Sequence, residues 1–278
     1  MAEARVFDVH NCILGEGPLW HPDRQELFWF DIIGKQLRSK ARVWDFDEYV
    51  SAAGWIDHDT LIMASASALW RFDISTGWRE KLVDMEADNA LTRSNDGRAD
   101  PWGGFWIGTM GINAEDGAGA IYRYYRGELV TLYKNISISN AICFAPDKSA
   151  AYWSDTLTRH IMRVALDPDH GWPEGPADVL IDVTAENLAP DGAVVDRDGN
   201  IWNAQWGSNR VAVYAPDGRF LKAVDVPAKQ ASCPAFGGAD FDQLFVTSAA
   251  EGLTGAVEGR TYVVDSVGRG LPEHQVRL

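Results

Sequence analysis

Four short polar clusters carry the side chains of this sequence that are best suited to chemistry. Each cluster has the composition of a turn and lies beside a strand-like run, and together they hold Glu16, Asn95, Asn140 and Asp191. Carboxylate and amide oxygens are the ligands that hard divalent cations such as Ca²⁺, Mg²⁺ and Mn²⁺ prefer. Asn-Gly and Asp-Gly pairs also form ordinary turns, so any one cluster could be only a solvated turn.

The first cluster, Gly15–Pro18, is the most distinctive of the four. Glycine admits backbone conformations that other residues avoid, and proline fixes its own φ, so this segment predicts a rigid turn that presents Glu16. The remaining clusters are Arg93–Gly97, Ser137–Ala141 and Pro190–Gly192. Whether they share one site depends on the elements that position them.

Strand-like units recur about six times along the chain. Their aromatic or aliphatic cores lie 34 to 50 residues apart and are centred on Phe28, Ile62, Trp106, Tyr152, Trp202 and Phe245. This is the spacing of propeller blades that contain four short strands each. Helix signals are scarce, and only Glu80–Ala87 could form one or two helical turns.

The repeat predicts an all-β fold, a six-bladed β-propeller, and favours it over a sandwich or a jelly roll. Radial closure of six blades also removes the exposed sheet edges that a long β chain must otherwise protect. No linker rich in Pro, Ser or charge divides the 278 residues, so we expect residues 1–278 to form a single domain.

The four polar residues keep a nearly constant place relative to these cores. Glu16 and Asn140 precede the next core by 12 residues, and Asn95 and Asp191 precede theirs by 11. Equivalent positions in different blades face the same central region. We therefore expect the four side chains to converge on one oxygen-lined site near the propeller axis.

Composition restricts the classes of partner. The chain has 25 basic and 40 acidic residues spread along its length, a formal charge of −15, whereas a nucleic-acid binder needs a concentrated cationic face. No long apolar run predicts a membrane helix, and the first residues lack the apolar segment of a secretory signal, so a cytoplasmic location is expected. The cysteines Cys12, Cys143 and Cys233 form no C-x-x-C pair and are expected to be reduced and buried.

Other catalytic signatures do not occur in the sequence. It contains neither Gly-x-Ser-x-Gly nor His-Glu-x-x-His, and its six histidines show no ligand-like pairing. Aromatic side chains could line a carbohydrate pocket, because sugar rings present apolar CH faces. We expect Trp206 to lie in such a pocket and Trp20, Trp106 and Phe236 to pack in the core.

Six motifs in register resemble the SMP-30/gluconolactonase/regucalcin family over nearly the whole chain. They are Leu14–Trp20, Arg93–Gly97, Gly108–Met110, Ile138–Asn140, Pro190–Gly192 and Phe236–Gly238. The resemblance implies a six-bladed β-propeller that carries one divalent metal ion in its central channel.

The same resemblance implies roles for individual residues. Glu16, Asn140 and Asp191 would be the metal ligands, while Arg93 and Asn95 would bind substrate oxygens. Glu115 matches a further substrate-side acid of the family only loosely. Family members usually have Asn-Gly where this chain has Asn140-Ala141, and alanine lacks the freedom of glycine at positive φ.

The activity that the resemblance implies is metal-dependent hydrolysis of a sugar lactone, an aldonolactone, to the corresponding acid. One divalent ion, Ca²⁺, Zn²⁺, Mg²⁺ or Mn²⁺, would polarise the carbonyl, and Asp191 would accept the proton of water. Two alternatives stay open, a calcium-binding regulatory propeller without catalysis and a phosphotriesterase-like hydrolase. Arg93 and Asn95 favour an enzyme, because an ion buffer needs no substrate-binding pair.

The expected partner is therefore a small-molecule sugar lactone, with no nucleic acid and no membrane. The protein is expected to be a monomer or a small homo-oligomer.

Overall fold

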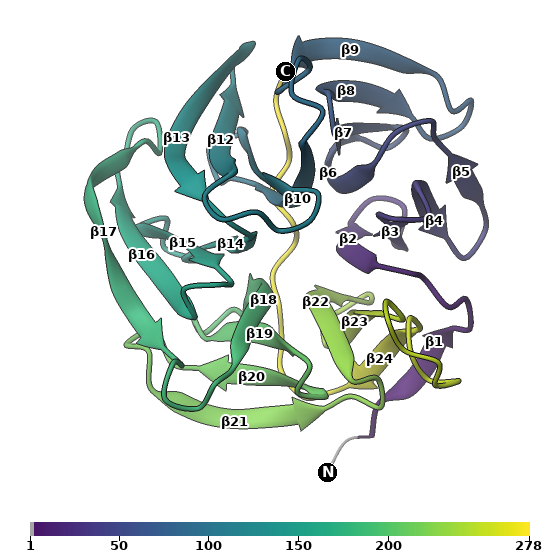
Figure 1. The fold of residues 1–278 in the computed structure, drawn as a ribbon, viewed down its shortest axis with the longest axis vertical. Coiled ribbons are helices and arrows are strands. Elements are labelled where there is room, and N and C mark those ends of the chain that lie inside the picture. Colours follow the sequence, from purple (N-terminus) through teal and green to yellow (C-terminus); the bar gives the residue numbers. More distant parts are fainter. Residues whose placement is uncertain (1–2) are drawn as a thin grey trace.

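Six four-stranded antiparallel sheets form a ring around a central axis (Figure 1). The structure, a computed structural model, describes residues 3–278. Blade 1 contains β2 (Gly15–His21), β3 (Glu26–Asp31), β4 (Gln36–Ser39) and β5 (Val43–Asp45). Blade 2 contains β6 (Val50–Asp57), β7 (Thr60–Ser65), β8 (Ala68–Asp73) and β9 (Arg79–Asp84). Blade 3 contains β10 (Thr92–Ala99), β11 (Phe105–Gly111), β12 (Gly119–Tyr125) and β13 (Glu128–Ile136).

The second half of the ring repeats this plan. Blade 4 contains β14 (Ser139–Phe144), β15 (Ala150–Asp155), β16 (His160–Leu166) and β17 (Pro173–Asp182). Blade 5 contains β18 (Ala189–Val195), β19 (Ile201–Trp206), β20 (Arg210–Tyr214) and β21 (Phe220–Asp225). Blade 6 contains β22 (Gln230–Gly237), β23 (Gln243–Ala249), β24 (Thr261–Asp265) and, from the other end of the chain, β1 (Arg5–Asp8). Because β1 pairs with β24, the first and last strands of the chain close the ring.

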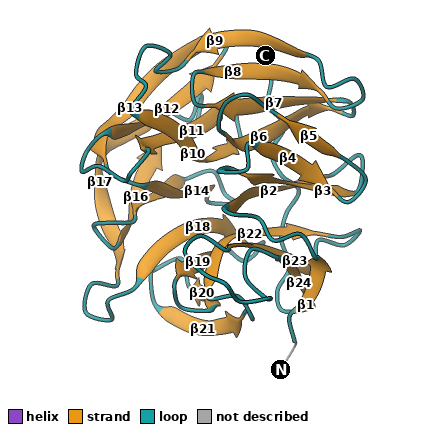
Figure 2. Cartoon of the chain, turned by 45° about the vertical axis from the view of Figure 1, so that its right-hand side comes forward, coloured by secondary structure: helices purple, strands orange, loops and turns teal. Residues whose placement is uncertain are grey.

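The prediction of a six-bladed β-propeller is confirmed. Each predicted aromatic or aliphatic core lies in the second strand of a blade, and Trp29, Trp106 and Trp202 are fully buried there. Residues 3–278 contain no helix, and none therefore that could cross a membrane (Figure 2). The three cysteines are buried and free, as predicted.

The expectation of helical turns over residues 80–87 is wrong, because the first five of these residues belong to β9. They are partly buried or exposed, and they pair with β8 on the outside of blade 2. Pairing with a neighbouring strand outweighs the helix propensity of the Glu, Lys and Leu residues found there.

The innermost strand of every blade has a register shift near its start. In β2 the shift falls between Glu16 and Leu19, and in β14 between Asn140 and Cys143. Such a β-bulge places extra residues opposite one partner residue and redirects the side chains around it. The six bulges lie at equivalent places in the ring, so each redirects side chains of its inner strand toward the axis.

Candidate active site

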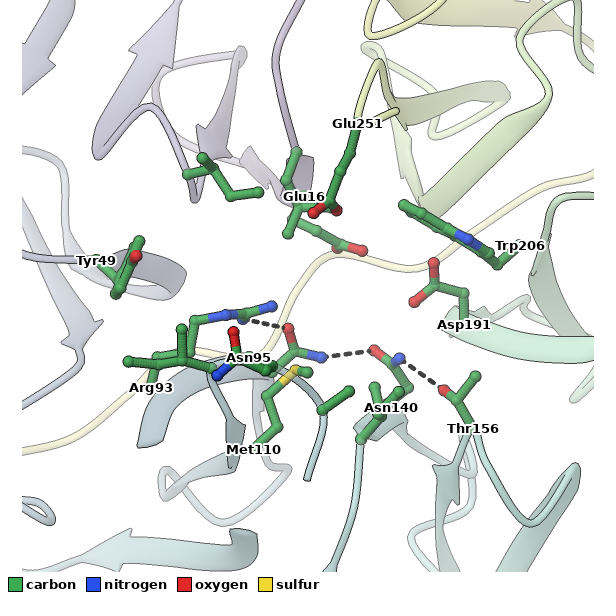
Figure 3. Close-up of a pocket in the computed structure, with 16 residues that line it drawn as sticks. Glu16, Tyr49, Arg93, Asn95, Met110, Asn140, Thr156, Asp191, Trp206 and Glu251 are labelled. Carbon is green, nitrogen blue, oxygen red and sulfur yellow. Dashed lines mark hydrogen bonds between the residues drawn. The ribbon is translucent and has the colours of Figure 1, made fainter. Parts of the chain in front are cut away.

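A cavity of about 520 Å³ opens at one end of the propeller axis. Glu16, Arg93, Asn95, Asn140 and Asp191 all line it (Figure 3). They come from the inner strands β2, β10, β14 and β18, where Glu16 and Asn140 immediately precede the bulge while Asn95 and Asp191 lie within it. The structure thus brings together residues that lie up to 175 positions apart in the sequence.

The two carboxylates of the cavity are almost completely buried. Glu16 and Asp191 are each only 5% exposed, and neither forms an ion pair among the described residues. Burial, and then the charge of Asp96, raises the pKa of Glu16 to about 8. Burial and the charge of Glu16 raise the pKa of Asp191 well above its usual range. A site that holds these two carboxylates in their charged form therefore needs a compensating cation.

Arg93 is the one basic residue among those of residues 3–278 that line the cavity, and it is itself buried. Its Nη1 donates to the carbonyl of Ser94 at 2.9 Å and to Oδ1 of Asn95 at 2.8 Å. Burial lowers the pKa of Arg93, and the neighbouring Glu16 and Glu251 oppose that effect. One guanidinium cannot balance two buried carboxylates and Glu251 together.

Asn140 is oriented by a chain of hydrogen bonds. Its Nδ2 donates to Oγ1 of Thr156 at 2.9 Å, and Thr156 in turn donates to the carbonyl of Pro190 at 2.7 Å. Its Oδ1 is thereby directed at the cavity, where Nδ2 of Asn95 donates to it at 3.2 Å (Figure 3). Thr156 therefore fixes the orientation of the Asn140 amide, in the way that groups behind a metal ligand commonly do.

The donor set fits a hard divalent cation. Two carboxylates and one amide carbonyl supply only oxygen, which suits Ca²⁺, Mg²⁺ or Mn²⁺. Glu16, Asn140 and Asp191 would hold such an ion, which would also offset the charge that the cavity buries.

A second group of ligand-type side chains, His10, Cys12 and Asp31, has its atoms within 4.8 Å of one another. The oxygens of Asp31 already accept hydrogen bonds from the backbone of Ile13, at 2.9 Å, and of Leu14, at 3.1 Å. Burial raises the pKa of the Cys12 thiol to about 12, which disfavours a thiolate ligand. In blade 4, Asp155 accepts backbone hydrogen bonds from the corresponding segment 137–138. Asp31 is therefore a structural residue of the turn.

Trp206 lines the cavity, whereas Trp20, Trp106 and Phe236 are buried in the core. The lining residues that sequence reasoning missed include Tyr49, Thr156 and Glu251. Each of the three directly precedes or closely follows a strand, and no local motif distinguishes it from an ordinary loop residue. Only the position of their three loops beside the cavity could have indicated these residues.

Glu115 does not reach the cavity in this structure. Its carboxylate accepts hydrogen bonds from the backbone nitrogen of Asn113 at 3.0 Å and from Nδ2 of Asn113 at 2.9 Å. The side chain thus stabilises its own turn and stays exposed, while Asn113 and Ala114 line the cavity. The expected substrate-side acid is therefore not among the residues that the fold brings together.

Ala141 has a φ of 56°, in the left-handed region that favours glycine. The equivalent residue of β2, Gly17, has a φ of 53°. Both directly follow a proposed metal ligand and begin a bulge, an arrangement that usually selects glycine. The loop thus keeps the backbone conformation that glycine would adopt, at the cost of strain in Ala141.

The fold and the site together define a six-bladed β-propeller with an acidic, oxygen-lined central cavity. Residues 14–250 match the sequence profile of the SMP-30/Gluconolactonase/LRE-like region. The chain belongs to this family, which confirms the resemblance found in its motifs.

Similar proteins include two that are named as lactonases. L-arabinolactonase of Azospirillum brasilense is 36% identical over 261 residues, which cover 90% of this chain and 85% of that protein. A pentonolactonase of Haloferax volcanii is 32% identical over the full length of both chains. The crystal structure of regucalcin from Agrobacterium tumefaciens, described as a calcium-binding protein, is 39% identical, with a TM-score of 0.96 over 100% of this chain and 98% of that one.

Proposed function

We propose that this protein hydrolyses an uncharged sugar lactone with one divalent ion held by Glu16, Asn140 and Asp191. The chain is an enzyme of the lactonase class, as the relatives of its family indicate. The observation that carries the metal-dependent part is the convergence of two buried carboxylates and one oriented amide oxygen in a cavity with a single arginine.

A divalent ion supplies Lewis-acid polarisation of a carbonyl when it is bound in such a site. The residues of the chain provide the remaining requirements. Asp191 is the proposed general base that accepts the proton of the attacking water. Within residues 3–278 the side-chain hydrogen bonds of Arg93 both come from Nη1, so Nη2 can donate to a lactone oxygen. Trp206 offers an apolar face to the sugar ring.

The charge of the cavity indicates the class of lactone. A divalent ion would balance Glu16 and Asp191, and Glu251 would then balance Arg93. With all four charges compensated, an uncharged lactone enters without an electrostatic penalty, whereas a lactone that carries a carboxylate or phosphate meets Glu251 at the mouth. Glu251 is therefore proposed as the group that disfavours anionic substrates.

The second candidate function is calcium binding without catalysis, and it is favoured by the similarity to the regucalcin structure. The buried pair Arg93 and Asn95 argues for an enzyme, because a simple ion store needs no buried guanidinium beside its ligands. A phosphotriesterase-like activity, a cytoplasmic location and a monomer or small homo-oligomer stay predictions from the sequence.

The decisive experiment is a hydrolysis screen of metal-stripped protein with a pH indicator. Five- and six-carbon aldonolactones are offered with Ca²⁺, Mg²⁺, Mn²⁺ or Zn²⁺ added back in turn, and a phosphotriester serves as the competing substrate. We expect acid release that depends on the ion and falls sharply in Asp191→Asn. Hydrolysis that persists undiminished after metal removal would contradict metal dependence, and tight Ca²⁺ binding without any hydrolysis would select the regulatory function.

A further inference from the structure

The C-terminal segment crosses the end of the ring opposite the cavity. Residues 266–278 form no strand and run across the centre of the propeller (Figure 1). Several backbone hydrogen bonds attach them to the blades: among these, the nitrogen of Gly270 donates to the carbonyl of Phe241 at 2.8 Å, that of Val276 to Trp55 at 2.9 Å and that of Arg277 to Gly103 at 2.8 Å. These acceptors lie at or near the turns between the first and second strands, while the cavity is lined from the other ends of those strands.

Glu273 of this segment reaches the axis and forms an ion pair with Nη1 of Arg98. The side chains of Glu273 and Arg98 are only 9% and 10% exposed. Glu273 also accepts a hydrogen bond through its backbone carbonyl from Nε1 of Trp55 at 2.8 Å. The segment thus places one carboxylate directly beneath the bulges of the inner strands, where it lines a small axial cavity with Gly17 and Asp96.

Arg98 joins the strands that carry two of the proposed ligands. Its Nε donates to the carbonyl of Ile142 at 3.1 Å, and its Nη2 donates to the carbonyl of Ala193 at 3.0 Å. These carbonyls lie two residues beyond Asn140 and Asp191 respectively. The planar guanidinium presents its donors in fixed directions, so it sets the distance between the bulges of β14 and β18.

Asp96 also binds the backbone of β14. Its Oδ2 accepts a hydrogen bond from the backbone nitrogen of Ile142 at 2.7 Å, and it follows Asn95 directly. The backbone of Ile142 is therefore held on both sides, its nitrogen by Asp96 and its carbonyl by Arg98. One guanidinium and two carboxylates form a buried network beneath the cavity.

We propose that Glu273 is a positioning residue of the metal site, acting from the opposite face of the propeller through Arg98. The inference rests on the proposed divalent site. Glu273 fixes the guanidinium, the guanidinium fixes the spacing of β14 and β18, and that spacing sets the distance between the oxygens of Asn140 and Asp191. The C-terminal segment is by this reasoning a working part of the site.

Without the carboxylate of Glu273, the guanidinium of Arg98 would keep its hydrogen bonds to two backbone carbonyls but would lose its ion pair. A buried ion that loses its partner reorients toward other acceptors, and partners that hold a ligand in place change metal affinity by roughly 10- to 100-fold when they are altered. Glu273→Gln keeps the volume of the side chain but removes its charge. We expect this variant to bind a divalent ion about 10-fold more weakly.

The test measures Ca²⁺ affinity by calorimetry on the metal-stripped full-length protein, together with the thermal stability of the metal-free form. Trp55→Phe is the matched control, because it removes the hydrogen bond to the carbonyl of Glu273 and leaves the ion pair with Arg98 intact. Arg98→Lys is the second variant, since lysine cannot reach both Ile142 and Ala193 at once.

The inference predicts weaker Ca²⁺ binding in Glu273→Gln and Arg98→Lys. In Trp55→Phe the affinity should stay within about 2-fold of the parent, well below the change expected when a group that orients a metal ligand is altered. Unchanged affinity in Glu273→Gln would overturn the inference. An equal loss in Trp55→Phe would also overturn it, because the segment would then act only through stability. If the parent protein itself binds no divalent ion, the proposed function fails, which is a separate outcome.

Discussion

The six inner strands share one backbone device but divide into two groups by what they present at it. Strands β2, β10, β14 and β18 place Glu16, Asn95, Asn140 and Asp191 at the bulge and line the cavity. Strands β6 and β22 have register shifts of the same kind, and their bulges contain serines, Ser51 and Ser232.

The hydroxyl groups of the two serines form hydrogen bonds inside the propeller wall. Oγ of Ser51 donates to Oγ of Ser94 at 2.8 Å, and Oγ of Ser232 donates to the carbonyl of Gly15 at 2.5 Å. Both are fully buried and neither lines the cavity. The comparison teaches that the fold offers six equivalent bulges. The length of the side chain at each bulge, and whether its oxygen is already engaged within the wall, decide which of them can bind a ligand.

The largest expected effect concerns Asp191, the proposed base. Asp191→Asn keeps the volume but cannot accept the proton of water, so kcat for lactone hydrolysis should fall by about 10² to 10⁴. Steady-state kinetics at saturating metal, with spontaneous ring opening subtracted, measure this loss. A variant with the parental kcat would place the base elsewhere.

The comparison between the two groups of bulges is tested most directly by metal affinity. Glu16→Gln replaces an anionic oxygen with a neutral amide and should weaken Ca²⁺ binding by at least about 10-fold, because ligand charge tunes affinity. Ser51→Ala, at the equivalent bulge of blade 2, should leave the affinity unchanged. Calorimetric titration measures the Ca²⁺ affinity of both variants. Equal affinities would contradict the division of the inner strands into ligand-binding and structural groups.

The pKa of Glu16, raised to about 8 in the metal-free protein, predicts a pH dependence of binding. Below that pH an ion must displace a proton, so affinity should rise with pH up to about 8, with protons released on binding. The folded state binds more protons than the unfolded state between the usual pKa of 4.5 and about 8, so the stability of the metal-free protein should fall as pH rises through this range.

Calorimetry in buffers of different ionisation enthalpy measures the proton release, and thermal unfolding of the metal-free protein measures the stability. Affinity that stays constant as pH rises toward the raised pKa would mean that Glu16 is already ionised without a metal, and hence that the cavity compensates its charge by other means.

Glu251 should act on selectivity more than on rate. Glu251→Gln leaves the metal-loaded cavity with the uncompensated charge of Arg93, so kcat/KM for an anionic lactone should rise about 3- to 30-fold relative to a neutral one, as expected for one charge acting through a partly screened gap. The ratio of kcat/KM for the anionic lactone to that for the neutral lactone, measured at two salt concentrations, checks this expectation. A ratio that stays constant would show that substrate charge is read by another group.

The smallest effect is expected at Ala141. Ala141→Gly relieves the strain of a φ of 56°, about 1 to 2 kcal/mol, but loses a buried methyl group worth about 0.8 kcal/mol, and glycine gains entropy when unfolded. The free energy of unfolding should therefore change by less than about 1 kcal/mol, and Ca²⁺ affinity should stay as it is. A marked gain in affinity would show that the alanine distorts Asn140.

Much of this protein follows from local sequence. The interval between aromatic cores predicts six blades because each blade buries one apolar second strand, and this burial must recur wherever a blade occurs. The near-constant offset of Glu16, Asn95, Asn140 and Asp191 from those cores predicts their convergence for the same reason. A repeated architecture turns equal positions in sequence into neighbouring positions in space.

Other parts were decided by the tertiary structure alone. Thr156 and Glu251 have no motif, and they reach the cavity only because their loops lie at the mouth of the ring. Glu115 was expected in the site, but its carboxylate accepts hydrogen bonds from the backbone and side chain of Asn113 in its own turn. Glu273 meets Arg98 across 175 residues, a contact made because the C-terminal segment crosses the end of the ring. Periodic burial can be read from a sequence, whereas single long-range contacts depend on where the chain returns.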